Sequence, residues 1–167
     1  MTETTPAADS GARANTAFVT AETDAAMRAL GRRIAGLLRP GDLLVLSGPL
    51  GAGKTTLTQG IGEGLGVRGP ITSPTFVIAR VHPSKTGGPA LVHADAYRLG
   101  GIDELDDLDL DTGMDESVTA VEWGEGIAEH LTDERLEITI ARHPDDTRRV
   151  TLTGLGARWS GVALDAE

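Results

Sequence analysis

The sequence predicts an α/β domain with a mainly parallel central sheet, extended by antiparallel strands and flanked by helices. In its first half, a continuous apolar run alternates with helical patterns, as in parallel sheets whose strands are buried on both faces. In its second half, short β-branched runs follow one another closely, which favours locally paired strands. The length of 167 residues suits one domain. We place it at 16–155, between a disordered tail at 1–15 and a C-terminal tail at 156–167.

Each element is predicted from its local pattern. Apolar residues recur at helical spacing over 20–38, where Thr20 is the predicted N-cap. The apolar run 43–47 predicts a strand buried on both faces. A helix is predicted at 54–65, although each of its three glycines costs about 0.5–1 kcal/mol relative to alanine, so packing must hold it. The remaining predictions are strands at 77–81, 90–94, 118–121, 136–140 and 150–152, and a short helix at 124–131.

The composition excludes several classes of protein. There are 15 Lys and Arg against 25 Asp and Glu, a formal charge of −10, which argues against direct binding to nucleic acid or to an anionic membrane. The absence of cysteine excludes disulfides and cysteine metal sites. No apolar run approaches the ~20 residues of a membrane span, and the N-terminus lacks a signal-peptide pattern, so we expect a cytoplasmic protein. Lys54 and Lys85 are the only lysines.

The strongest motif lies between the predicted strand 43–47 and the predicted helix 54–65. It matches G-x-x-x-x-G-K-[ST], the phosphate-binding loop or P-loop, and reads Gly48-Pro49-Leu50-Gly51-Ala52-Gly53-Lys54-Thr55. Its glycines let backbone N–H groups surround phosphate oxygens, and the helix that follows directs its positive end at the same phosphates. The lysine supplies a charge to the β- and γ-phosphates, and the threonine hydroxyl can bind Mg²⁺. A ligand-free glycine-rich turn is the alternative, but the flanking strand and helix favour the nucleotide.

ATP is the expected nucleotide, and Mg²⁺ the expected metal. A GTPase of the usual kind needs an Asn/Thr-Lys-x-Asp element, which neither lysine of this chain provides. Asp95 and Glu122 end two predicted strands, where ligands bind in open α/β sheets. One carboxylate can hold Mg²⁺ while the other orients the attacking water. Sequence order alone leaves open which of the two touches the metal.

Further motifs carry a resemblance to a known family. After the P-loop and Thr56, the chain contains Ser73-Pro74-Thr75-Phe76, then His93-Ala94-Asp95-Ala96-Tyr97-Arg98-Leu99, then Glu122-Trp123. In this order and at these spacings they resemble the TsaE family, small bacterial ATPases of tRNA threonylcarbamoyladenosine biosynthesis. The resemblance covers residues 17–153.

The resemblance implies a P-loop NTPase fold and slow ATP hydrolysis, with TsaB-like and TsaD-like proteins as partners and tRNA contacted only through them. It also implies roles for individual residues. Thr55 and Glu122 would bind Mg²⁺, residues 48–56 would surround the phosphates, Thr75 and Asp95 would lie near the γ-phosphate, and Trp123 would lie beside the nucleotide. Lys54, Thr75, Asp95 and Glu122 are the catalytic candidates. Pro49 stands where the family usually has Asp; because proline lacks an N–H, any role of that acid is in doubt, although we expect ATP binding to survive.

A histidine and an acidic segment can each be explained by structure as well as by function. His93 lies on an alternating strand and is expected to be a half-buried histidine with a satisfied hydrogen bond rather than a ligand. Eight acids and no base occupy 103–116, interleaved with leucines. The segment is a candidate docking patch for basic partner surfaces, and its alternative is a solvated acidic loop.

Two alternatives to an ATPase remain. A small-molecule kinase shares the P-loop but usually adds an arginine-rich lid, whereas residues 100–134 contain no arginine. A non-catalytic adaptor would bind ATP only to set the shape that a partner recognises. ATP turnover, alone and with the partners, separates the three.

Overall fold

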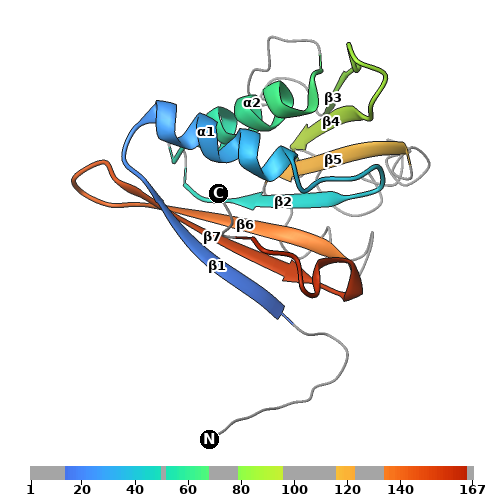
Figure 1. Ribbon diagram of the computed structural model, residues 1–167. Coiled ribbons are helices and arrows are strands. Elements are labelled where there is room, and N and C mark those ends of the chain that lie inside the picture. The colour runs from blue at the N-terminus through green and yellow to red at the C-terminus, as the bar shows by residue number, and fades with distance from the viewer. Residues whose placement is uncertain (1–13, 50–51, 68–78, 96–115, 123–133, 165–167) are drawn as a thin grey trace, which may run out of the picture.

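The computed structural model contains a seven-stranded sheet with two α-helices on one face (Figure 1). It describes residues 14–49, 52–67, 79–95, 116–122 and 134–164. The helices are α1 (Asp24–Ala35) and α2 (Lys54–Leu65). The strands are β1 (Ala14–Ala21), β2 (Leu43–Ser47), β3 (Ala79–His82), β4 (Ala90–Asp95), β5 (Ser117–Glu122), β6 (Arg135–Arg142) and β7 (Arg148–Leu155).

The sheet confirms the predicted mixture of parallel and antiparallel pairing. Its strand order is β1-β7-β6-β2-β5-β4-β3. The four central strands β6, β2, β5 and β4 are parallel, while β3 on one side and β7 and β1 on the other are antiparallel to their neighbours. All five residues of β2 are buried, as expected for a central strand covered on both faces. The parallel strands therefore end along one edge of the sheet, beside the start of α2.

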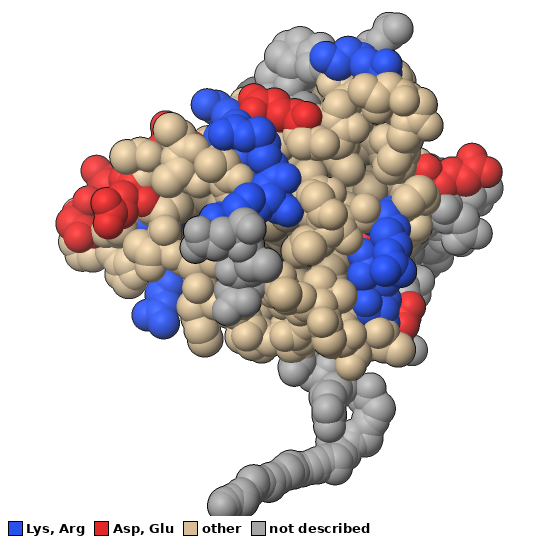
Figure 2. Space-filling view, viewed as in Figure 1, with Lys and Arg blue, Asp and Glu red and all other residues tan. Residues whose placement is uncertain are grey.

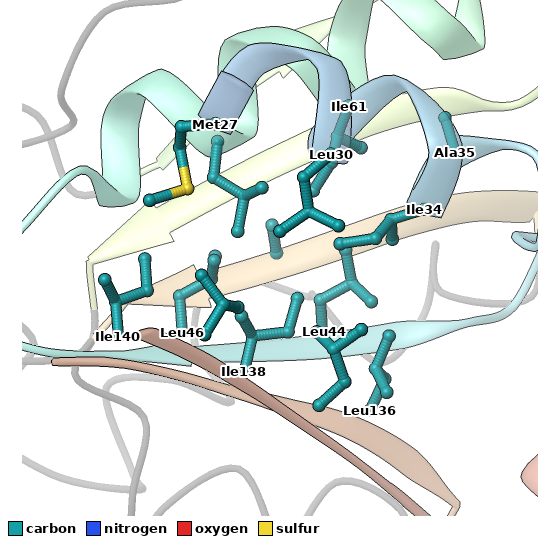
Figure 3. Close-up of a cluster of buried hydrophobic side chains, with 14 of the residues drawn as sticks. Met27, Leu30, Ile34, Ala35, Leu44, Leu46, Ile61, Leu136, Ile138 and Ile140 are labelled. Carbon is teal, nitrogen blue, oxygen red and sulfur yellow. The ribbon is translucent and has the colours of Figure 1, made fainter. Parts of the chain in front are cut away.

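The core lies between α1, α2 and the sheet. Side chains from α1 point toward side chains from β2 and β6, and residues such as Met27 and Leu46 are completely buried (Figure 3). The helices pack with their backbones in close contact at glycines. A Cβ built on Gly60 would lie 2.1 Å from the carbonyl oxygen of Arg28, and one built on Gly31 would lie 2.4 Å from that of Leu57. The glycines that weaken α2 as an isolated helix are thus what allow it to pack.

The predicted start of the first helix is wrong. Residues 14–21 form strand β1, and α1 begins at Asp24, where the side chain of Thr23, not Thr20, accepts a hydrogen bond from Ala26 N at 3.0 Å. Small and apolar residues alternate with exposed ones along β1, which is the pattern of a strand with one buried face. Asn15, placed in the predicted tail, belongs to this strand.

Part of the predicted C-terminal tail is also folded. Ala157–Trp159 forms the short 3-10 helix η5, and the Trp159 side chain is completely buried. Arg158 forms a bidentate ion pair with Asp42 (2.9 and 2.8 Å), donates to the carbonyl oxygen of Leu37 and stacks on the Trp159 ring. The packed structure therefore continues past residue 155 to Leu164, which is buried.

The other predicted elements agree with the structure where it describes them. Each predicted strand overlaps an observed one, and the predicted helix 54–65 is α2. Of the predicted strand 77–81, residues 79–81 lie in β3, and the predicted helix 124–131 lies outside the described residues. Among the described residues, neither helix has the length and apolar character needed to cross a membrane.

Candidate functional site

The P-loop connects β2 to α2 at the edge where the parallel strands end. Gly48 follows β2 with a φ of 154°, and a Cβ there would lie 2.8 Å from the carbonyl oxygen of Ile140 on β6. Gly53, the N-cap residue of α2, has a φ of 109°, in the region that favours glycine. Leu50 and Gly51 lie outside the described residues. The loop thus needs glycine at both ends, once for space and once for backbone conformation.

Lys54 is buried against the loop that precedes it. The residue is only 6% exposed. Its Nζ donates to the carbonyl oxygens of Gly48 (2.5 Å) and Pro49 (3.2 Å). The carbonyl of Pro49 also accepts from Ala52 N at 3.1 Å. Proline therefore fits this loop, because the position contributes its carbonyl here, and proline retains that group. A buried ammonium at the start of a helix is a site to which an anion is attracted.

The first turn of α2 offers further groups to an anion. Gly53 has no side chain to cap the helix, and the first turn, which the structure describes completely, contains no acidic residue. Thr55 and Thr56 lie in this turn and are half-buried. The first N–H groups of a helix have no partner within it and carry partial positive charge. The loop and helix together fit a polyphosphate.

Glu122 ends β5, the strand next to β2. It pairs with Leu46 in the parallel register, one residue before β2 ends. It is 4% exposed, and its Oε2 lies 2.7 Å from Nε2 of His93, a residue that is completely buried. His93 is thus more deeply buried than predicted, and its partner is the carboxylate singled out for the metal. No motif in the sequence marks this pair. Its signal is that His93 stands two residues before Asp95 on β4, and that Asp95 pairs with Glu122 on β5.

The remaining predicted site residues are placed only in part. Asp95 pairs with Glu122 in the backbone register of β4 and β5, so both acids stand at the strand ends beside the P-loop. Thr75 and Trp123 lie outside the described residues. Among the described residues, no group of three or more His, Asp or Glu could hold a metal ion by itself. Mg²⁺ is usually bound through one or two carboxylates together with the phosphates of a substrate.

Arg148, which no motif marks, approaches the P-loop from the start of β7. A Cβ built on Gly53 would lie 3.9 Å from its Nη1 and 3.2 Å from the terminal methyl of Met27. The same Nη1 donates to Oδ1 of Asp24 at 2.7 Å. This hydrogen bond and the guanidinium charge are the main reasons why the pKa of Asp24 is lowered from its usual value of 3.8. The arginine and Asp24, in the first turn of α1, therefore flank the loop.

Comparisons with known proteins find related sequences and a similar fold. A family model described as threonylcarbamoyl adenosine biosynthesis protein TsaE matches residues 21–150. The tRNA threonylcarbamoyladenosine biosynthesis protein TsaE of Streptomyces coelicolor is 66% identical over 139 residues, 80% of this chain and 94% of that protein. Its namesake in Bacillus subtilis is 44% identical over 133 residues, 79% of this chain and 82% of that protein. The crystal structure of Bacillus subtilis YdiB superimposes with a TM-score of 0.74 at 34% identity, over 89% of this chain and 91% of that chain.

Proposed function

The chain belongs to the TsaE family of threonylcarbamoyl adenosine biosynthesis proteins, and from this premise we propose that it binds and slowly hydrolyses ATP in the presence of Mg²⁺. The hydrolysis serves the threonylcarbamoyladenosine modification of tRNA. The observation that carries the proposal is the buried Lys54, held on the carbonyls of a glycine-bounded loop at the N-terminus of α2. A desolvated cation beside the first N–H groups of a helix is suited to the β- and γ-phosphates.

Residues on three neighbouring elements would act on the nucleotide. Residues 48–56 surround the phosphates, and Lys54 holds the charge of the transferred group. The Thr55 hydroxyl and the Glu122 carboxylate hold Mg²⁺, which would neutralise charge on the phosphate oxygens. His93 fixes the orientation of Glu122 through its buried hydrogen bond. These roles rest on the register of β2 and β5 and on the chemistry of the side chains.

Three other positions complete the proposed site. Thr75 and Asp95 act near the γ-phosphate, where one of them orients the attacking water, and Trp123 contacts the nucleotide. The backbone pairing of Asp95 with Glu122 supports the first of these roles for Asp95. The roles of Thr75 and Trp123 rest on family membership.

We propose that the protein acts in the cytoplasm with TsaB-like and TsaD-like partners and reaches tRNA only through them. The chain has ten more acids than bases, whereas the described residues contain 12 Lys and Arg and 11 Asp and Glu. The face in Figure 2 carries groups of both signs, set among uncharged residues. Such a mixed surface is unsuited to a polyanion. The acidic segment 103–116, most of it outside the described residues, is the proposed docking patch for a basic partner surface.

ATP turnover of Lys54→Ala tests the proposal. We expect the variant to lose the turnover of the wild type, both alone and with the TsaB-like and TsaD-like proteins of the same organism. Lys85→Ala is the matched control, because Lys85 is the only other lysine and is exposed. Full turnover by Lys54→Ala would reject the proposed site. Stoichiometric transfer of phosphate to a metabolite would favour a kinase, and ATP binding without turnover, even with the partners, would favour an adaptor.

A further inference from the structure

We propose that Arg148 is a second cation of the phosphate site and that it contacts the polyphosphate of the bound nucleotide directly. This inference rests on the proposed function, since it assigns a residue to the same nucleotide. It adds an arginine from β7, far from the P-loop in sequence, to the lysine that the loop itself supplies.

The position of Arg148 follows from the pleat of the sheet. Val150 and Leu152 on β7 are completely buried in the core beneath the helices, so Arg148 shares the face of β7 that the helices cover. At the start of the strand this face meets Gly53, where a Cβ would lie 3.9 Å from Nη1. The neighbouring Arg149 has the opposite orientation and lies over the Phe18 ring, 5.0 Å from its centroid. Only the first of these two arginines thus lies beside the P-loop.

Arg148 has one donor, Nε, that no described residue satisfies. The side chain is 14% exposed, Nη1 donates to Asp24, and Nε is buried without an acceptor among the described residues. A buried N–H without a partner destabilises the folded state, so a shift that brings it an acceptor is favourable. The planar guanidinium matches the oxygens of a phosphate and can bind two of them at once. A nucleotide at Gly53 would bring such oxygens next to this group.

The present partner of Arg148 can be exchanged or shared. Asp24 is 69% exposed, and an exposed ion pair contributes little stability because water and salt screen it. Asp24 also stands in the first turn of α1, where the helix dipole stabilises a carboxylate without the arginine. A polyphosphate carries more charge than one carboxylate. Arg148 can therefore turn toward the nucleotide while α1 stays intact.

Calorimetric titration of the full chain with ATP and Mg²⁺ tests this inference without measuring turnover. We expect Arg148→Gln to bind ATP about tenfold more weakly than the wild type, as when one charged hydrogen bond is lost. Arg149→Gln is the matched control and should bind like the wild type. Asp24→Asn should bind as tightly as the wild type or more tightly, because it releases Arg148. Arg148→Lys keeps the charge but not the planar fork, so its affinity for ATP should lie between those of the wild type and Arg148→Gln. It replaces Arg148→Gln in the test if that variant does not fold.

Two results would overturn the inference. One is wild-type affinity in the Arg148 variant, and the other is an equal loss in Asp24→Asn, which would show that only the ion pair matters. If the wild type binds ATP but Arg148→Gln binds equally well, the inference fails and the proposed function stands. If the wild type itself binds no ATP, the proposed function fails and the inference fails with it.

Discussion

Nε2 of His93 lies 2.7 Å from Oε2 of Glu122, and both residues are buried, one on β4 and the other at the end of β5. A carboxylate in this position has lost most of its water, so its orientation is set by the protein groups around it. The pair therefore joins two parallel strands at the edge of the sheet where the P-loop begins. It gives the proposed metal ligand one fixed direction before any nucleotide arrives.

Replacing His93 should destabilise the fold and loosen the site. We expect His93→Leu to lower the free energy of unfolding by about 1–3 kcal/mol, because it leaves the buried carboxylate without its partner. His93→Gln can donate to the same oxygen and should lose less. Urea unfolding measures the change, and His143→Leu, on an exposed residue, is the control. Unfolding curves that coincide with the wild type would show that the hydrogen bond contributes nothing.

Glu122→Gln separates the metal role from the structural one. The amide keeps the shape of the side chain and can still bond to His93, so we expect the melting temperature to change little. ATP binding should lose most of its dependence on Mg²⁺, because a neutral amide is a poorer ligand for this cation. Titration of ATP binding against Mg²⁺ gives the readout. Glu116→Gln, on an exposed residue just before β5 begins, is the control and should match the wild type. An unchanged Mg²⁺ dependence in Glu122→Gln would remove Glu122 from the metal site.

The contact between α1 and α2 should not tolerate a methyl group at Gly60. In Gly60→Ala the new Cβ would meet the carbonyl oxygen of Arg28, and backbone cannot move aside as a side chain can. We expect a loss of at least about 1–3 kcal/mol, despite the better helix propensity of alanine. Gly88→Ala, where the nearest atom would lie at 3.7 Å, is the control and should stay within about 0.5 kcal/mol of the wild type. Equal stability of the two variants would show that the helices can separate without cost.

Residues after 155 should be required for a stable fold. A chain that ends at Leu155 loses Trp159 from the core and leaves Asp42 buried without Arg158. A chain that ends at Leu164 keeps both groups and should unfold like the wild type. The single variant Trp159→Ala should lose about 3–5 kcal/mol, as large core truncations do. Thermal unfolding of the three chains decides the point, and a fully stable chain ending at 155 would contradict it.

The ion pair of Asp24 and Arg148 should show a defined pH dependence. Because the pKa of Asp24 is lowered in the folded state, its contribution is present above the unfolded value of 3.8 and disappears as the pH falls through the lower folded value. Asp24→Asn should therefore melt slightly below the wild type at about pH 6 and together with it at about pH 2–3. The difference at the higher pH should shrink with added salt. A difference that grew at low pH would have the wrong sign.

The local pattern of apolar residues and glycines was enough to predict the central strands and the P-loop. The run 43–47 and the glycine-rich turn after it can be read locally, because a buried strand and a P-loop depend on neighbouring residues. β1 and η5 could not be read in this way. β1 is an edge strand whose small residues, such as Ala17 and Ala21, give little apolar signal. Trp159 is buried in the folded sheet, where it packs against Gly154 of β7, and no apolar pattern around it indicates this.

The same division holds for the candidate site. The loop glycines, Lys54 and the carboxylates at strand ends have types and spacings that chemistry restricts. The residues that pair with these groups have no such restriction on type or spacing. His93 reaches Glu122 across 29 residues, and Arg148 reaches Asp24 across 124. Such contacts follow from strand order, which places β4 beside β5 and β7 beside β1.

The pairing of β1 with β7 also bears on synthesis of the chain. The first described strand cannot find its place until the seventh has left the ribosome, and Asn15 donates to Trp159 and Val162 across 144 and 147 residues. Contacts so distant in sequence close large loops and slow folding. A nascent chain that has released only its P-loop still lacks β6, which supports Gly48, and β7, which carries Arg148. The proposed phosphate site would thus form late, so a chain cut short during translation would lack part of the site proposed to bind nucleotide.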